Sequence, residues 1–136
     1  MFQYPKRTVV ALLASFMVSP TTPAASTSAD RLAGARLAGE LCAACHTFGD
    51  GDETGWGPDL DGIVDRPVGA EEGYRYGSYL RAQQAAGATW DEAALRAWLV
   101  DSKAIARAAN NRTKMPAQRL TTDQLDDLMS YLRTLQ

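Results

Sequence analysis

The sequence predicts an all-α protein of about four helices joined by long loops. Three observations support this fold class. Apolar residues recur at steps of three and four in separate segments, no segment is convincing as a strand, and glycine and proline concentrate in the connections. With 136 residues, 46% of them hydrophobic, and a formal net charge of −2, the chain suits one soluble domain. Nothing in its composition indicates disorder or nucleic-acid binding.

The first 29 residues are expected to be a signal peptide. Lys6 and Arg7 precede an apolar run of 11 residues, Thr8 to Val18, which is too short to span a bilayer. Small residues follow, and the candidate cleavage points among them are Ala24, Ala25 and Ala29. An uncleaved membrane anchor is the alternative. The folded domain is expected over residues 30–136, outside the cytoplasm.

The first helix is predicted over residues 30–46, with Asp30 at its start. Its apolar stripe consists of Leu32, Ala35, Leu37, Ala38 and Leu41. Either Gly34 or Gly39 is expected to admit another backbone at close range. A loop rich in glycine, aspartate and proline follows over residues 47–73, and such a long loop usually has a function or wraps a ligand.

Three further helices are expected. A short one over 75–84 begins near Tyr76 and Ser78, and an extended link at 88–90 follows it. The third begins at the acidic residues 91–92 and ends near Ser102. Its predicted apolar face consists of Ala94, Leu95, Trp98 and Leu99. Residues 103–120 form a second long loop.

The last helix is predicted over residues 122–135, with Thr121 or Thr122 as its N-cap. Its buried stripe consists of Leu125, Leu128, Met129, Leu132 and Leu135, with Tyr131 beside it.

The most informative motif lies at the end of the first helix. The pentapeptide from Cys42 through Cys45 to His46 contains the only two cysteines and the only histidine of the chain. Cys-x-x-Cys-His is the signature of covalent c-type haem attachment. Two thiols three residues apart lie on one side of a helical turn and suit the two vinyl groups of one porphyrin. The next residue then supplies a neutral imidazole to the iron.

Three other interpretations of the cysteines remain open. A thioredoxin-like redox pair needs a βαβ context, which the sequence lacks. Structural zinc usually takes four nitrogen or sulfur ligands, and this chain has three cysteine and histidine residues. A structural disulfide would suit an exported protein.

A second axial ligand must come from a residue other than histidine. Of the four methionines, Met1 and Met17 lie in the targeting segment, and Met129 lies on the apolar stripe of the last helix. Met115, in an irregular loop before Pro116, is the candidate sulfur ligand, although it is also consistent with simple core packing. Histidine–methionine ligation raises the reduction potential and suits electron transfer.

Over residues 30–136 the chain resembles the class I cytochromes c of the bacterial periplasmic and mitochondrial branch. The motifs that carry this resemblance are Cys-Ala-Ala-Cys-His-Thr at 42–47, Gly-Pro-Asp-Leu-Asp-Gly at 57–62, Arg66, Tyr76, Gly-Ala-Thr-Trp at 87–90, Thr-Lys-Met-Pro at 113–116 and Leu-Met-Ser-Tyr-Leu-Arg at 128–133. The resemblance implies a small cytochrome c fold whose loops wrap one covalent haem c.

The resemblance also implies roles for individual residues. The carbonyl of Pro58 is expected to accept a hydrogen bond from His46, and the haem propionates are expected to bind Arg66, Tyr76 and Trp90. Gly34 is expected to let the first helix cross the last, against Leu128 and Tyr131. Trp98 is expected beside the haem on the methionine side. Ala38 and Leu80 depart from the family pattern, which often has an aromatic residue and an amide there.

The function implied is one-electron transfer between redox proteins, in a periplasmic monomer that is not an enzyme. Expected partners are a quinol–cytochrome c reductase, a terminal oxidase or a dehydrogenase. The alternatives are a haem enzyme or sensor with an open sixth coordination site, and a dedicated electron-accepting subunit of a dehydrogenase.

Charge is distributed unevenly along the chain. Residues 50–72 contain eight acids and one base. Between Asp101 and Asp123 there are five bases and no acid, namely Lys103, Arg107, Arg112, Lys114 and Arg119. This pattern predicts a positive surface near Met115 that steers acidic partners, although a merely solvated loop is an equal alternative.

Overall fold

The structure is a computed structural model that describes residues 26–49 and 55–135. It contains four helices within these ranges, which are α1 (Ser28–Leu41), α2 (Ser78–Ala85), α3 (Glu92–Ala108) and α4 (Thr122–Leu132). Apart from one isolated bridge between Pro67 and Thr89, the described residues form no β-structure. The predicted all-α fold class is therefore confirmed. Most of the predicted signal peptide lies outside the described residues.

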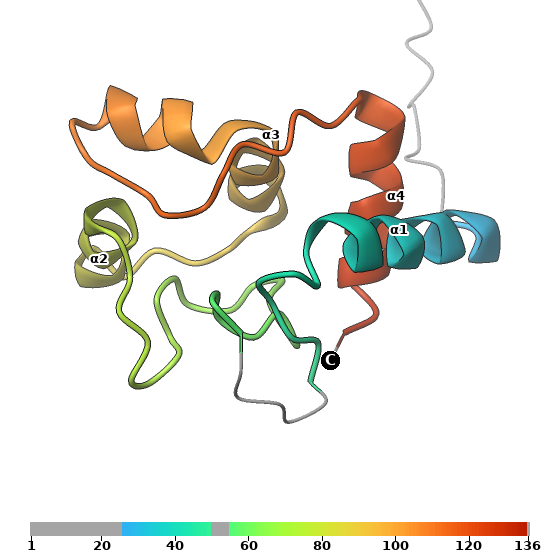
Figure 1. The fold of residues 1–136 in the computed structure, drawn as a ribbon, viewed down its shortest axis with the longest axis horizontal. Coiled ribbons are helices and arrows are strands. Elements are labelled where there is room, and N and C mark those ends of the chain that lie inside the picture. The colour runs from blue at the N-terminus through green and yellow to red at the C-terminus, as the bar shows by residue number, and fades with distance from the viewer. Residues whose placement is uncertain (1–25, 50–54, 136) are drawn as a thin grey trace, which may run out of the picture.

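Helices α1 and α4 cross one another on one side of the molecule (Figure 1). Gly34 lies at the crossing, where an added Cβ atom would lie 2.0 Å from the backbone oxygen of Asp127 and 2.8 Å from Cβ of Tyr131. Only a residue without a side chain allows this contact between helices. Beyond its chain neighbours and the backbone of its own helix, Gly39 has no atom within 4 Å of the same position, so Gly34 is the glycine that admits the second backbone.

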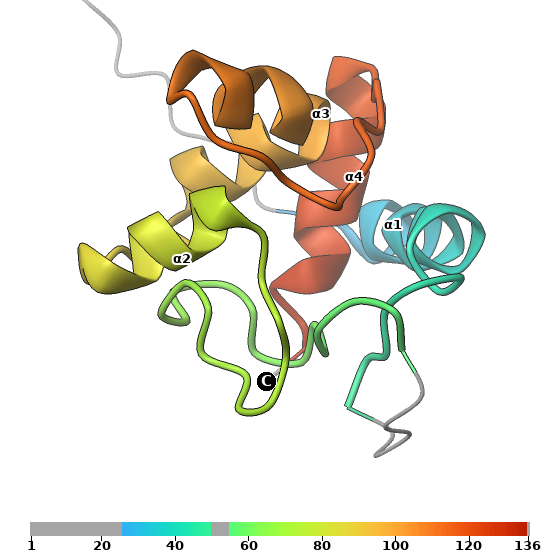
Figure 2. The same ribbon diagram turned by 60° about the vertical axis from the view of Figure 1, so that its left-hand side comes forward.

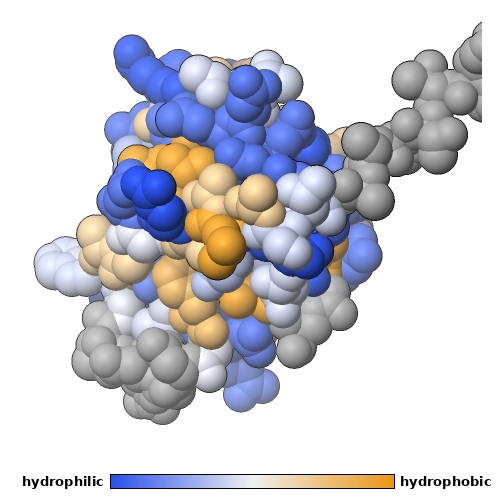
Figure 3. Space-filling model, turned by 90° about the vertical axis from the view of Figure 1, so that its right-hand side faces the viewer, coloured by the Kyte–Doolittle hydropathy of each residue, from blue (hydrophilic) through white to orange (hydrophobic). Residues whose placement is uncertain are grey.

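This crossing corrects the apolar stripe predicted for the first helix. The buried residues of α1 are the small ones, Gly34 and Ala38. Leu32 is 69% exposed and Leu41 39% exposed, because α1 packs through its small residues and not through these leucines. Figure 3 shows the side of the molecule where α1 begins, with apolar residues at the centre and hydrophilic residues around them.

Helix α1 also begins earlier than predicted and ends earlier. Thr27 is its N-cap, and a reciprocal pair of hydrogen bonds joins Thr27 and Asp30. The helix ends at Leu41, so the cysteines follow it in a turn instead of lying within it.

Helix α4 begins where it was predicted to begin and ends at Leu132, three residues before the predicted end. Thr121 is the N-cap, accepting a hydrogen bond from the backbone N–H of Gln124. The predicted stripe lies in one core with residues of α1 and α3, whose buried members are Ala38, Ile63, Leu95, Leu99, Leu125, Leu128, Met129 and Leu132. The predicted role of Met129 as core packing is confirmed, since its side chain is fully buried there.

Helix α3 is longer than predicted, and it is kinked. Its N-cap is Asp91, which accepts a hydrogen bond from the backbone N–H of Ala94. Asp101 has non-helical dihedral angles (φ −151°, ψ 78°), and its side chain accepts a hydrogen bond from the N–H of Ala104 at 2.8 Å. Asp101 thus interrupts the helix and caps its continuation, which carries the chain to Ala108 instead of ending near Ser102.

The second long loop is therefore shorter than predicted. Residues 109–121 run from the end of α3 to the start of α4 (Figure 2). Hydrogen bonds tie this loop to the beginning of α2, since the backbone N–H of Arg112 donates to Oγ of Ser78 at 2.9 Å and the N–H of Tyr79 donates to the Arg112 carbonyl at 3.1 Å.

None of the helices in the described ranges is sufficiently long and apolar to cross a lipid bilayer.

Candidate haem site

One cavity collects the chemically distinctive side chains of the chain. Its wall includes Cys42, Cys45 and His46 after α1, and Met115 from the 109–121 loop. Much of the remaining wall is apolar, with contributions from Leu60, Ile63, Leu80, Leu95, Leu99 and Leu132. The fold therefore brings residues about 70 positions apart in the sequence around a single apolar space.

The two cysteines occupy different environments within one turn. The backbone N–H groups of Cys45 and His46 both donate to the carbonyl of Cys42 at 2.9 Å, which continues the helical path past α1. Cys42 is buried and Cys45 is exposed, and no disulfide joins them. Burial, with a smaller contribution from Cys45, raises the pKa of the Cys42 thiol to about 11. A thiol that stays protonated near neutral pH argues against a reactive redox pair, whose pKa is lowered.

The imidazole of His46 is held in one tautomer. Its Nδ1 lies 2.7 Å from the carbonyl oxygen of Pro58. Because a carbonyl only accepts, Nδ1 must carry the proton, and Nε2 keeps a free electron pair. Gly57 packs against the same ring, since a Cβ on Gly57 would lie 2.5 Å from Cε1 of His46. The sequence alone does not indicate this role, because Gly57 is one glycine among many in its loop.

An antiparallel bridge sets two of the predicted propionate-binding residues side by side. Pro67 pairs with Thr89, and the N–H of Trp90 donates to the carbonyl of Arg66 at 2.9 Å. The Arg66 guanidinium donates to the backbone oxygens of Asp61 and Asp59. Both Arg66 and Trp90 line the cavity.

Tyr76 approaches the same cavity from the segment before α2. Its hydroxyl oxygen accepts a hydrogen bond from the backbone N–H of Glu71 at 3.2 Å. Burial raises the pKa of the Tyr76 phenol above its usual value, so the group stays protonated. The hydroxyl therefore keeps its own proton available for an acceptor in the cavity. The indole N–H of Trp90, on the same cavity wall, donates to no atom of the residues that the structure describes.

The structure does not support the alternative interpretations of the cysteines. Within the described residues no cluster of three or more histidine, cysteine, aspartate or glutamate side chains is placed to hold a metal ion. Cys42 and Cys45 are not bonded to one another. The four helices also leave no βαβ unit in the part of the chain that the structure describes.

Comparison with known proteins identifies the same architecture. The family model for cytochrome c matches residues 32–136. The cytochrome c2 of Rhodospirillum rubrum is 31% identical over 116 residues, covering 82% of this chain and 85% of that protein. A cytochrome c-550 of Novispirillum itersonii is 34% identical over 110 residues, covering 78% of this chain and 98% of that protein.

A solved structure supports the likeness in three dimensions. Cytochrome c2 from Rhodospirillum centenum superimposes with a TM-score of 0.69 at 28% identity, covering 78% of this chain and 98% of that one. The helices and the cavity define a small all-α fold of the class I cytochrome c type. The chain belongs to the cytochrome c family. Members of this family carry electrons on one covalently attached haem c, and this chain is a carrier of that kind.

Proposed function

We propose that Cys42 and Cys45 hold the haem through thioether bonds, and that His46 and Met115 are its axial ligands. The observation that carries this proposal is the convergence of these four side chains on one apolar cavity. The donor set fits the group, because a neutral imidazole and a thioether sulfur are common axial ligands of haem iron. When bound, the haem supplies an iron that changes between the ferrous and ferric states.

The protein's own residues prepare this site. The Pro58 carbonyl fixes the proton of His46 on Nδ1 and makes Nε2 a better electron donor. Arg66, Tyr76 and Trp90 offer hydrogen-bond donors to the haem propionates, which would otherwise be costly to bury. Their shared position on the cavity wall, and the free donors of Tyr76 and Trp90, support this role.

Covalent attachment is tested on denatured protein. The full chain, exported from a cell with the haem-attachment machinery, is expected to keep its haem through a denaturing gel and to show the pyridine haemochrome spectrum of a haem c. A Cys42→Ser, Cys45→Ser double variant is expected to lose the haem on the gel. A colourless wild-type band would overturn the proposal.

We infer that the protein acts in the periplasm as a monomeric carrier and not as an enzyme. A sulfur ligand at the sixth position leaves no open site for substrate, which supports transfer over haem catalysis. The partners would be soluble or membrane-bound redox proteins such as a quinol–cytochrome c reductase, a terminal oxidase or a dehydrogenase.

The start of α1 narrows the choice of signal-peptide cleavage site. Thr27 caps α1, and the hydroxyl of Ser130 donates to Oγ of Ser26 at 2.9 Å. Cleavage after Ala29 would remove both contacts, so we expect cleavage after Ala24 or Ala25. The intact mass of the mature holoprotein tests this, and a mass corresponding to an N-terminus at Asp30 would contradict it.

The positive residues near Met115 are available to a partner. Lys103, Arg107, Arg112, Lys114 and Arg119 are all exposed. Among the described residues none of the five belongs to an ion pair. Lys114 itself lines the cavity, so the positive surface reaches the edge of the haem site. We propose that this surface steers acidic partners.

Small redox reagents of opposite charge test the steering. Reversing Arg112 and Arg119 to Glu is expected to slow oxidation by anionic hexacyanoferrate(III) at low salt and to speed oxidation by a cationic cobalt complex. The matched control reverses Arg31 and Arg36, which changes net charge equally but lies on α1 and not on the 109–121 loop that carries Met115. Equal effects of the two double variants would contradict a localised steering surface.

A further inference from the structure

One peptide group lies between His46 and a carboxylate. The carbonyl oxygen of Pro58 lies 2.7 Å from Nδ1 of His46. The N–H of the same peptide group, which belongs to Asp59, donates to Oε2 of Glu71 at 2.6 Å. The carbonyl and the N–H of a trans peptide group point in opposite directions, and the residues that the structure describes contain no cis peptide bond. His46 and Glu71 therefore bind the two ends of a single polar unit.

Hydrogen bonds around this peptide group hold it in place. Pro58 has no N–H of its own, so its neighbours determine where its carbonyl lies. The carboxylate of Asp59 accepts hydrogen bonds from the hydroxyl of Thr47 and, at 2.9 Å, from the backbone N–H of Gly49. Because Thr47 directly follows His46, the side chain of Asp59 ties the peptide group to the backbone beside the imidazole.

Glu71 is fixed on the other side of the peptide group. Its backbone N–H donates to the hydroxyl of Tyr76 at 3.2 Å, and Tyr76 is buried. Among the residues that the structure describes, no arginine or lysine forms an ion pair with Glu71. The negative charge of its carboxylate is therefore not neutralised by a basic side chain there, and it lies against the peptide N–H.

A carboxylate in this position changes the electron distribution of the peptide group. An anion that accepts a hydrogen bond from the N–H shifts electron density through the conjugated amide toward its oxygen, because hydrogen bonds in a chain polarise one another. The Pro58 oxygen becomes a stronger acceptor for the Nδ1 proton of His46. In many metal sites a carboxylate binds the histidine N–H directly and makes the imidazole a better electron donor. Here one peptide group lies between the carboxylate and the imidazole.

We propose that Glu71 is a positioning residue that acts on His46 through the Pro58–Asp59 peptide group and lowers the reduction potential. A stronger imidazole donor stabilises the oxidised iron more than the reduced iron, which gives the direction of the change. This inference rests on the proposed role of His46 as an axial ligand. It goes beyond that role by assigning the donor strength of the imidazole to a carboxylate that His46 does not bind.

Removing the charge of Glu71 tests the proposal in the holoprotein. Glu71→Gln keeps the length of the side chain and an acceptor oxygen, and it is expected to raise the equilibrium constant for one-electron reduction about threefold in a redox titration. In the reduced protein, the proton NMR signal of the His46 ring N–H is expected to move upfield, because its hydrogen bond to Pro58 becomes weaker. The matched control is Glu72→Gln, which removes the charge of the exposed neighbour. It is expected to leave this signal in place and to change the equilibrium constant less than about 1.5-fold.

A second variant separates the peptide contact from charge acting through space. Glu71→Asp keeps the charge but shortens the side chain by one methylene group, which withdraws the carboxylate from the Asp59 N–H. The His46 ring N–H signal is expected to move upfield as it does in Glu71→Gln. A signal that stays in place in either Glu71 variant would overturn the proposal, as would a change in potential for Glu71→Gln no larger than that for Glu72→Gln. A wild-type protein without covalent haem on the denaturing gel would instead overturn the proposed function itself.

Discussion

The two halves of the molecule hold their cavity residues by different means. In the half formed by α1 and α4, Gly34 lets two backbones touch, and the most extensive helix–helix contact of the described chain surrounds it. In the half formed by α2, α3 and the 109–121 loop, the loop is tied in place by single hydrogen bonds: Trp98 and Ser102 donate to it, and Ser78 accepts one from it. His46 lies just after α1 of the first half, and Met115 lies in the 109–121 loop of the second half.

This difference predicts which substitutions each half of the molecule tolerates. A close-packed crossing has no room for added volume, so an extra methyl group is costly there. A loop held by separate hydrogen bonds is sensitive to each lost donor, typically by about 1 kcal/mol. The half formed by α1 and α4 should therefore be destabilised most by added volume. The half formed by α2, α3 and the 109–121 loop should be destabilised most by the loss of hydrogen bonds.

Adding a methyl group at the α1–α4 crossing should have the largest effect on stability. Gly34→Ala would place Cβ 2.0 Å from the Asp127 oxygen, so the helices must separate. We expect the free energy of unfolding of the holoprotein, measured by chemical denaturation, to fall by about 3 kcal/mol.

The matched control lies five residues further along the same helix. Gly39 is exposed and has open space around it, so Gly39→Ala should raise the free energy of unfolding by about 0.5–1 kcal/mol. A similar loss for both variants would show that helix packing at Gly34 is not what holds this half together.

The same substitution in the other half should act on the ligand more than on the fold. A Cβ on Gly77 would lie 2.8 Å from the carbonyl of Arg112 and 3.2 Å from Cα of Thr113, two residues before Met115. We expect Gly77→Ala to displace the loop, weaken the absorption of methionine–ferric ligation and cost about 1–2 kcal/mol of stability. An unchanged spectrum with a loss as large as that of Gly34→Ala would remove the distinction between the halves.

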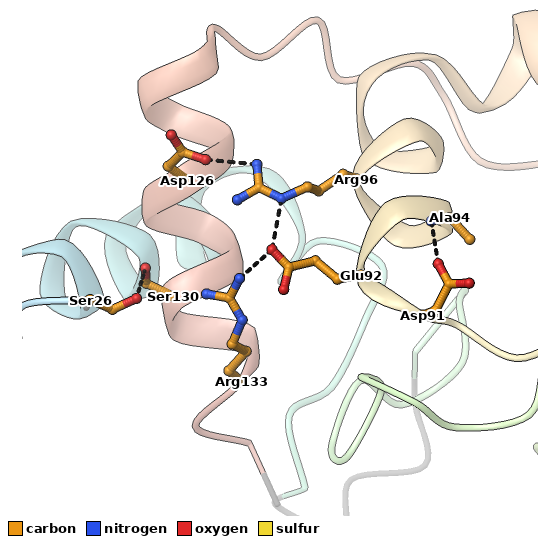
Figure 4. Close-up of polar contacts among 8 residues, drawn as sticks. All are labelled: Ser26, Asp91, Glu92, Ala94, Arg96, Asp126, Ser130 and Arg133. Atoms are coloured by element: carbon orange, nitrogen blue, oxygen red, sulfur yellow. Dashed lines mark hydrogen bonds and ion pairs between the residues drawn. The ribbon is translucent and has the colours of Figure 1, made fainter. Parts of the chain in front are cut away.

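The smallest effect is expected where ion pairs join the halves. Glu92 of α3 accepts hydrogen bonds from Arg133, the C-cap of α4, and from Arg96, and Arg96 also contacts Asp126 at 2.7 Å (Figure 4). These hydrogen bonds, that from Arg133 first, lower the pKa of Glu92 to about 2. The stabilisation is therefore present above the ordinary pKa of 4.5 and is lost as the pH falls toward 2.

Removing the Glu92 charge should weaken the pH dependence of protein stability at acidic pH. The Glu92 side chain is 46% exposed, so solvent screens the pairs and we expect Glu92→Gln to cost less than about 1 kcal/mol at pH 6. In thermal unfolding measurements, the cost should begin to shrink below pH 4.5 and approach zero only as the pH falls to about 2. Glu72→Gln, which changes an exposed glutamate outside these pairs, is the control. A cost that grows as the pH falls would contradict the assignment.

The features that the sequence predicts correctly depend on neighbouring residues. The capped stripe of α4 repeats at helical spacing. Cys42, Cys45 and His46 form a local motif, and the structure places all three on one cavity wall. The contact between Pro58 and His46 follows from the family pattern and is matched by a 2.7 Å distance.

The features that the sequence does not predict depend on distant residues. The buried face of α1 is set by the close contact of Gly34 with the backbone of Asp127. Apolar spacing alone therefore does not predict that Leu32 is exposed. The continuation of α3 had a local signal, because Asp101 lies three residues before Ala104 in a run of good helix formers. The contact of Ser102 with Met115 had none, since it depends on the path of the loop.

The most direct test of the account is the absorption of methionine–ferric ligation in the oxidised holoprotein. The wild type and Met129→Leu are expected to show it, because Met129 is a fully buried core residue that leucine replaces at a cost below about 1.5 kcal/mol. Met115→Leu is expected to lack it while keeping its covalent haem. A wild-type spectrum without this absorption, or a Met115→Leu spectrum that retains it, would contradict the assignment of Met115 as the second axial ligand.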